Sequence, residues 1–245
     1  MHSASAGMTL LLAAGACFAQ TAPERPAYEA ASVKLNISGS GGTDTDGTRG
    51  QIMIRNMTLH RLVELAYSVS PAQVVGPDWM ENVRFDVTAK YPPDANAADR
   101  WLMLRALLEE RFKLAVHRES REVQGYALVV AKGGFKLKPV EAGENDTDHA
   151  GGRVQTLTAK STSIASLAGL AARYLGAVVI DKTGIDGVYD FQLRWTSDGE
   201  NTDNADAPPL FPVAIQETLG LRLQAQKVPA EVIVVDHAER IPTEN

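Results

Sequence analysis

The stretches VRFDVTAK (residues 83–90) and VYDFQLRW (residues 188–195) decide the fold, because they repeat one pattern in two parts of the chain. In each stretch an aromatic residue lies next to an aspartate, Asp86 or Asp190, and apolar residues alternate with polar ones. A Val-Val pair lies shortly before both, at 74–75 and 178–179. Strict alternation predicts a strand with one face buried and one face in water.

The sequence around the first stretch predicts a complete unit of strands and helices. QIMIRN (51–56) alternates like a strand, and a helix is expected to follow with Thr58 as its N-cap, since a threonine hydroxyl can accept from a first-turn N–H. A second helix is expected over 98–112, and the strands KLAVHRE (113–119) and GYALVVAK (125–132) close the unit. The apolar stripes of the two helices are Leu59, Leu62, Val63 and Ala66, and then Trp101, Leu104, Leu108 and Phe112.

The same order of elements is expected around the second stretch. VQTLTAK (154–160) reads as a strand, Ser163 as the N-cap of a helix, and AVVID (177–181) as a short strand. Another helix is expected over 209–219, because proline is tolerated in a first turn and Gly220 suits the C-terminal position. The strands LRLQAQ (221–226) and EVIVVDH (231–237) finish the copy; the first helix carries Ile164, Leu167, Ala168 and Ala171 in one stripe.

We therefore expect an α+β fold: a tandem duplication of a βαββαββ unit, with mixed or antiparallel sheets and helices packed on one face. The other sheet face needs a cover, and the second copy is the nearest candidate, so we expect the two copies to pack together as a pseudo-symmetric pair. The expected organisation is a signal peptide (1–19), an N-terminal extension (20–50), a first repeat (51–138), a linker (139–152), a second repeat (153–240) and a tail (241–245).

Composition and the leader favour an exported globular protein. With 245 residues, 44% hydrophobic, and a net charge of -6, the chain can build a core but has no basic block for nucleic acid. The apolar run from Met8 to Ala19 is too short to span a bilayer and predicts a signal peptide with Gln20 as the mature start. Alternatively the run is a plain apolar leader, or Cys17 is a lipidated anchor. Because Cys17 is the only cysteine, no internal disulfide can form.

Several segments carry a family resemblance. The chain resembles the soil-associated acidobacterial duplicated orphan family, a domain of unknown function, from about Tyr28 to Asn245. This resemblance implies an exported protein with many paralogues, some fused to membrane metallopeptidase sensors; it implies no catalytic residues, and this chain lacks the HExxH motif of such a peptidase. The matching segments are YEAASVKLN (28–36), NMTLHRLVELAY (56–67), VVGPDWMENVRFDVTAK (74–90), 104–139, DKTGIDGVYDFQLRW (181–195) and VVDHAERIPTEN (234–245), with HRESRE (117–122) and DKTG (181–184) as the most specific.

Each candidate site has a functional and a structural interpretation. Asp86 and Asp190 could form a carboxylate pair if the copies met, or each could serve a turn or an arginine within its own copy. HRESRE, with His117, could be a ligand-binding ridge or a solvated, ion-paired turn between two strands, and we favour the turn. The acidic segments 43–47, 145–149 and 198–206 could bind calcium, but none is a complete twelve-residue calcium loop, so solvated loops are expected.

The remaining candidates also favour structural roles. His60, His117, His149 and His237 lack zinc-site spacing, and we interpret them as surface or strand-end residues. Trp79, Trp101 and Trp195 could line a ligand groove, but core or inter-repeat contacts are the expected role. The sequence thus assigns no catalytic, metal-binding or cofactor-binding residue.

The sequence therefore favours a non-enzymatic exported protein that presents a groove or a sheet edge to an envelope component. Two alternatives remain open. One is an extracytoplasmic hydrolase that uses Asp86, Asp190 or His117 as acid-base groups. The other is a small-molecule sensor whose ligand lies in the cleft between the copies.

Overall fold

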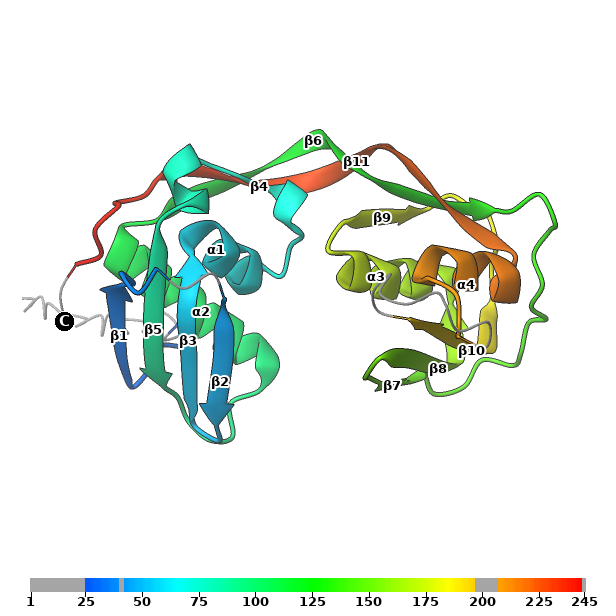
Figure 1. Cartoon of the computed structure of the whole chain (residues 1–245), viewed down its shortest axis with the longest axis horizontal. Coiled ribbons are helices and arrows are strands. Elements are labelled where there is room, and N and C mark those ends of the chain that lie inside the picture. Colours follow the sequence, from blue (N-terminus) through cyan, green and yellow to red (C-terminus); the bar gives the residue numbers. More distant parts are fainter. Residues whose placement is uncertain (1–24, 40–41, 197–206, 244–245) are drawn as a thin grey trace, which may run out of the picture.

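The structure is a computed structural model that describes residues 25–39, 42–196 and 207–243. It has an α+β fold in which one long two-stranded ribbon connects two lobes (Figure 1). The expected signal peptide with Cys17, and the acidic segment 198–206, lie outside the described residues. Among the helices that are described, none combines the length and the apolar character needed to cross a membrane.

The first lobe contains a four-stranded antiparallel sheet in the order β1-β5-β3-β2. Two helices pack on its inner face, because β5 buries Phe85, Val87 and Ala89 and turns Thr88 and Lys90 outward. The elements are β1 (Ala30–Leu35), β2 (Asp44–Thr48), β3 (Gln51–Thr58), β5 (Arg84–Lys90), α1 (Leu59–Tyr67) and α2 (Ala97–Phe112).

The second lobe contains a three-stranded antiparallel sheet in the order β10-β8-β7. Its strand β10 also alternates, with Tyr189, Phe191, Leu193 and Trp195 buried. The elements are β7 (Asp146–Ala150), β8 (Val154–Ser163), β10 (Val188–Thr196), α3 (Ile164–Leu175) and α4 (Phe211–Leu219).

The ribbon consists of β6 (Ala115–Val130) and β11 (Leu221–His237), which pair antiparallel along their whole lengths. At about 3.3 Å per residue each strand spans roughly 50 Å, enough to run over both lobes. A short strand joins each end: β4 (Val74–Val75) pairs parallel with β11, and β9 (Val178–Asp181) pairs parallel with β6. Two 3₁₀ turns, η1 (Pro71–Gln73) and η2 (Asp78–Glu81), flank β4.

Each strand of the ribbon contributes residues to both hydrophobic cores. Ile233 and Val235, from the end of the chain, are buried in the first core, while Leu128, from the first half, is buried in the second. A small third cluster of Val123, Val228 and Val232 lies in the ribbon itself. Each lobe is therefore completed by a strand segment from the other half of the sequence.

Most of the local expectations are confirmed. The Thr58 and Ser163 hydroxyls accept from the N–H groups of Arg61 and Ser166, at 3.2 and 3.1 Å. Gly220 ends α4 with φ at 70°, as expected for a left-handed C-cap. The apolar stripes of α1 and α3 are buried throughout; in α2, Leu104, Leu108 and Phe112 are buried and Trp101 is half-buried.

Three expectations are wrong. HRESRE is no turn: it lies inside β6, and the two closing strands expected for each unit are one continuous strand. The acidic segments 43–47 and 145–149 are no loops, because β2 and β7 form there and pair with the neighbouring strands β3 and β8. The sheets of the two lobes do not cover each other; Figure 1 shows them apart, and the connection runs through the ribbon.

Candidate functional site

Asp86 and Asp190 lie in different lobes and do the same structural task. The Oδ1 atom of Asp86 accepts the backbone N–H of Asn56 at 2.8 Å, and Oδ1 of Asp190 accepts that of Ser161 at 2.8 Å. Asn56 and Ser161 have positive φ angles of 57° and 47°. Each carboxylate thus stabilises a left-handed residue where a strand ladder shifts its register. The two aspartates therefore lie apart, and each holds a backbone N–H at a register shift within its own lobe.

His117 lies on the solvent side of the ribbon. Its Nδ1 is 2.8 Å from a carboxylate oxygen of Asp236 on the paired strand, and about half of its side chain is exposed. In the same segment Arg118 pairs with Glu231 across the ribbon, and Arg121 pairs with Glu119. The side chains of HRESRE are therefore solvated and ion-paired as expected, although they are on a strand.

His60 is a buried residue, which the sequence analysis did not predict. Its side chain is 10% exposed; Nδ1 lies 2.9 Å from Glu64 Oε1, and Nε2 lies 3.1 Å from Glu81 Oε1. Arg61 also contacts Glu64, which is 4% exposed. The hydrogen bond with Glu64 raises the pKa of His60, and it outweighs the opposing effect of burial. In the described part of the chain no serine, threonine or cysteine nucleophile contacts this imidazole.

The other histidines form no metal centre. His237 is exposed at the end of β11, and the His149 ring stacks on that of Trp195, with centroids 5.9 Å apart and 19° between the planes. Among the residues that the structure describes, no group of three His, Cys, Asp or Glu side chains could hold a metal ion.

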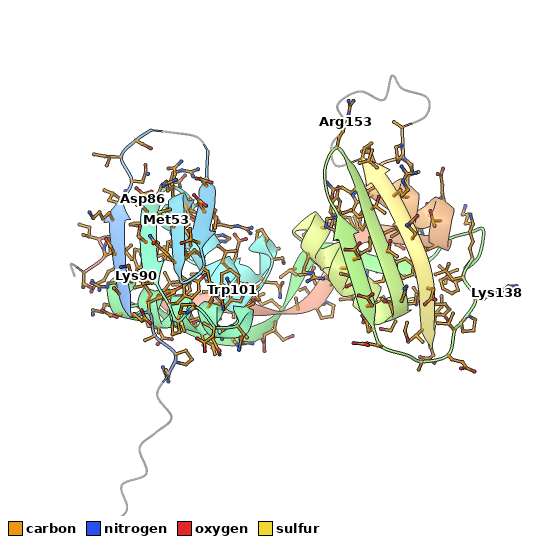
Figure 2. The ribbon with its side chains drawn as sticks, turned by 90° about the horizontal axis from the view of Figure 1, so that it is seen from below. Met53, Asp86, Lys90, Trp101, Lys138 and Arg153 are labelled. Atoms are coloured by element: carbon orange, nitrogen blue, oxygen red, sulfur yellow. The ribbon has the colours of Figure 1, made fainter. Side chains whose placement is uncertain are left out.

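A cleft of about 460 Å³ separates the two lobes beneath the ribbon. On the first-lobe side it is lined by the end of α1 and by Trp101, which Figure 2 shows on the side of the lobe that faces the second lobe. On the second-lobe side α3 and β9 present small residues, Gly169, Ala172 and Gly176 among them. The cleft is therefore largely apolar, with charged groups at Arg61, Glu64 and Arg173.

An aromatic pocket of about 450 Å³ opens on the other side of α3. Its walls include Trp195, Tyr174, Phe211 and His149, whose rings pack edge-on, tilted or stacked, with centroids 4.4 to 5.9 Å apart. The indole Nε1 of Trp195 is buried in this wall, and none of the described residues forms a hydrogen bond with it. A buried donor without an acceptor costs about 1–3 kcal/mol, which makes this atom unusual in a folded core.

Arg173 joins the cleft and the pocket. Its side chain lines both of them, and also a third hollow of about 280 Å³ between them, lined by Asn145, Ser166 and Leu170. Among the described residues it makes no ion pair and no hydrogen bond through its side chain. We call this continuous surface, centred on Arg173 and running from Trp101 to Trp195, the α3 groove.

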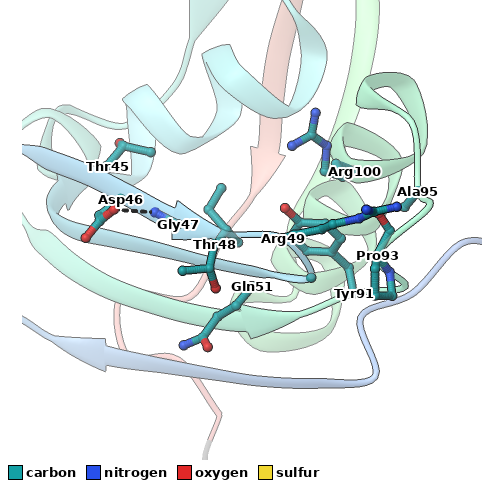
Figure 3. A pocket seen from close by; sticks show the side chains of 12 residues that line it. Thr45, Asp46, Gly47, Thr48, Arg49, Gln51, Tyr91, Pro93, Ala95 and Arg100 are labelled. Carbon is teal, nitrogen blue, oxygen red and sulfur yellow. Dashed lines mark hydrogen bonds between the residues drawn. The ribbon is translucent and has the colours of Figure 1, made fainter.

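A more polar hollow of about 500 Å³ lies in the first lobe beside the β2–β3 turn (Figure 3). Its two arginines are already held: Arg49 Nε donates to the carbonyl of Pro93 at 3.2 Å, and the Arg100 guanidinium lies 5.6 Å from the ring centre of Tyr91. The rest of its wall is mostly turn backbone and polar side chains such as Thr45 and Gln51. The α3 groove is therefore the stronger ligand site, because it combines apolar walls with a charge that no described residue neutralises.

Comparison with known families identifies the chain. A profile described as "Protein of unknown function (DUF3738)" matches residues 60–238, more than half of the sequence. The chain belongs to the DUF3738 family. The expected domain of unknown function is thus confirmed at the level of the family. No curated protein and no solved structure matches the chain.

The matched region of the DUF3738 family contains every described residue that lines the α3 groove, from Arg61 to Phe211. The groove was only partly accessible to sequence reasoning. Trp101 and Trp195 were recognised as possible groove residues, and the cleft between the copies as a possible ligand site. Arg173 was missed, because an arginine on an amphipathic helix gives no sign that its charge is unpaired.

Proposed function

We propose that this protein is an exported, non-enzymatic binding module whose ligand lies in the α3 groove. The observation that carries the proposal is Arg173, which lies between an apolar cleft and an aromatic pocket and has no ion-pair partner among the residues that the structure describes. A site of this kind recognises a ligand through apolar burial and one well-placed charge. Asp86, Asp190 and His117 are each engaged in structural contacts in separate places, which favours binding over acid-base chemistry.

The walls of the groove specify the ligand chemistry. The rings of Trp195, Tyr174 and Phe211 favour a planar apolar group, because aromatic faces stack on flat surfaces. The Arg173 guanidinium favours an anionic group next to it, since it can donate two parallel hydrogen bonds to a carboxylate or sulfonate. We therefore propose a small planar anion as the ligand class.

Naphthalene-2-sulfonate tests this proposal, with the neutral 2-naphthalenemethanol as its matched probe. We expect the sulfonate to bind the mature protein and to change the fluorescence of Trp101 or Trp195. Arg173→Ala should weaken sulfonate binding about tenfold or more, because a charge-assisted hydrogen bond contributes about 1.5–3 kcal/mol. Binding of the alcohol should change little.

Arg194→Ala is the control variant, since Arg194 is an exposed arginine on β10 outside the groove. Equal affinities of wild type and Arg173→Ala for the sulfonate would contradict the proposed site. Failure of both probes to bind at millimolar concentration would contradict the proposed ligand class.

We propose that the protein is exported to the periplasm or out of the cell. This part of the proposal rests on the apolar leader from Met8 to Ala19. A lipid anchor at Cys17 is the alternative attachment. N-terminal sequencing of the protein from the envelope fraction should begin at Gln20. A chain recovered with Met1 intact would argue against cleavage.

We further propose that the two halves arose by duplication. The support is the recurrence of one element order, β3-α1-β4-β5-α2-β6 in the first half and β8-α3-β9-β10-α4-β11 in the second. A family member whose halves differ in element order would argue against this origin.

A further inference from the structure

The two lobes differ at one sheet edge. In the first lobe β1 covers the outer edge of β5, but in the second lobe β10, which occupies the equivalent position, is itself the edge strand. Among the described residues only the two ends of that edge are engaged: Val140 N–H donates to the Val188 carbonyl at 2.9 Å, and Thr196 N–H donates to the Pro209 carbonyl at 3.1 Å. In the described part of the chain, the edge from Tyr189 to Trp195, about 23 Å long, pairs with no strand other than β8 on its inner side.

The helix beside this edge exposes apolar side chains where the first lobe buries them. Leu114 and Leu221 each follow a helix, α2 or α4, after one intervening residue. Aligned on these two leucines, Leu210 and Val213 correspond to Met103 and Ala106. In the first lobe Met103 is 5% exposed, and with Ala106 it faces Ala30 and Ala31 beside β1. In the second lobe Leu210 and Val213 are each 44% exposed. A strand on β10 would cover them.

The aspartates show a second difference. In the first lobe Asp86 Oδ1 accepts from two donors, the Asn56 N–H and the Asn36 side-chain amide, each at 2.8 Å. Asn36 directly follows β1. In the second lobe Asp190 accepts only the Ser161 N–H among the described residues, and its side chain is exposed. In the first lobe, the Asp86 carboxylate accepts the Asn36 amide. The equivalent carboxylate, Asp190, has no such side-chain donor among the described residues.

We propose that the free edge of β10 binds an extended segment of a partner protein by strand addition. The segment would run antiparallel to Tyr189–Trp195, place small or branched apolar side chains against Leu210 and Val213, and end in a side-chain amide at Asp190. The pattern is that of β1 itself, AASVKL followed by Asn36, which the same molecule binds on β5. Backbone hydrogen bonds would supply affinity, and alternate side chains would supply specificity.

A separate polypeptide fits this edge better than a second copy. The β1 strand of another copy is already paired over all of Ala30–Leu35 in its own sheet, so it would have to leave that sheet first. Compared with the first lobe, the described part of the second lobe has one strand fewer at this edge, and a short segment is long enough to supply one strand. Trp195 belongs both to this edge and to a wall of the α3 groove, but Asp190, Leu210 and Val213 do not line the groove. The inference depends on these three residues, so it goes beyond the proposed ligand and does not depend on it.

The test uses a labelled peptide with the β1 sequence, YEAASVKLN, and the mature protein in fluorescence anisotropy. We expect saturable binding that Val213→Lys weakens at least tenfold, because a charge would then face the apolar side of the peptide. Leu102→Lys is the matched control: Leu102 is 40% exposed on α2 of the first lobe, and its substitution should leave affinity unchanged.

Changes in the peptide distinguish strand addition from non-specific adsorption, and they leave the protein unaltered. Methylation of alternate backbone nitrogens should abolish binding, and replacement of the final Asn by Asp should weaken it severalfold through repulsion by Asp190. Equal affinity of Val213→Lys and wild type, or no saturable binding at millimolar peptide, would overturn the proposal. A protein dimer that Val213→Lys dissociates would also overturn it, by assigning the edge to a second copy. Either result would leave naphthalene-2-sulfonate binding at the α3 groove unaffected.

Discussion

His60 and Glu64 form a buried ion pair on α1, next to the cleft between the lobes. Both side chains are at most 10% exposed, and Arg61 supplies a further positive charge to Glu64. Buried charges of this kind are retained only when their partners are in place, because an uncompensated charge in a core is costly. The pair therefore couples the local fold of α1 to protonation of the imidazole.

We predict that this pair makes stability depend on pH above neutrality. The folded protein raises the pKa of His60 above the unfolded value of 6.5, so its stabilising contribution is complete below 6.5. The contribution is lost as the pH rises through the folded pKa. Urea unfolding between pH 6 and pH 9 should show stability falling over this interval, and His60→Ala should reduce the slope.

His237→Ala is a suitable control, because His237 is exposed at the end of β11. The prediction is contradicted if the unfolding free energy of the wild type stays constant across this pH interval. It is also contradicted if His60→Ala leaves the slope unchanged, because protonation of the pair would then not be coupled to folding.

At the scale of the element, the pairing of β9 with the ribbon depends on Gly125. A Cβ atom at Gly125 would lie 2.6 Å from the carbonyl oxygen of Val178 and 2.8 Å from Cγ2 of Val228. Only glycine lets β9 approach β6 closely enough to pair with it. A glycine within a predicted strand often marks such a close backbone approach, but the sequence does not show which segment approaches.

The edge strands β2 and β7 show a different limit of sequence reasoning. Their sequences, DTDGT and DTDHA, contain almost no apolar residues, and every position is exposed. Hydrophobic periodicity cannot detect a strand that buries neither face. These strands exist because their backbones pair with β3 and β8, and their charged side chains suit an edge that must not aggregate.

For the whole molecule, the exchanged ribbon makes each lobe depend on residues from the other half of the chain. Ile233 lies in the second half of the sequence, is fully buried, and belongs to the first core. Leu221 lies on the same strand, β11, and is fully buried in the second core. The two lobes are therefore joined by shared strands and core packing, which two tandem domains connected only by a linker would lack.

We predict that Ile233→Ala destabilises the first lobe by about 2–5 kcal/mol, the usual range for a large-to-small substitution in a core. Native-state hydrogen exchange should show the loss of protection in α1 and β5. Leu221→Ala, the matched variant, should instead reduce protection in α3 and β10. Loss of protection confined to the second lobe in both variants would contradict strand exchange.

The sequence by itself determined the local elements: the caps Thr58 and Ser163, the buried stripes of α1 and α3, the alternation of β5 and β10, and the repeated order. These follow from residue spacing and from hydrogen bonds within a few residues, which the sequence contains directly. It did not determine that β6 and β11 run unbroken between the lobes. Nor did it determine that, among the described residues, Arg173 has no ion-pair partner and β10 has no equivalent of β1. Those features depend on which distant segments meet, and only the tertiary structure decides that, because the periodicity of a segment shows which face is buried but not which segment it packs against.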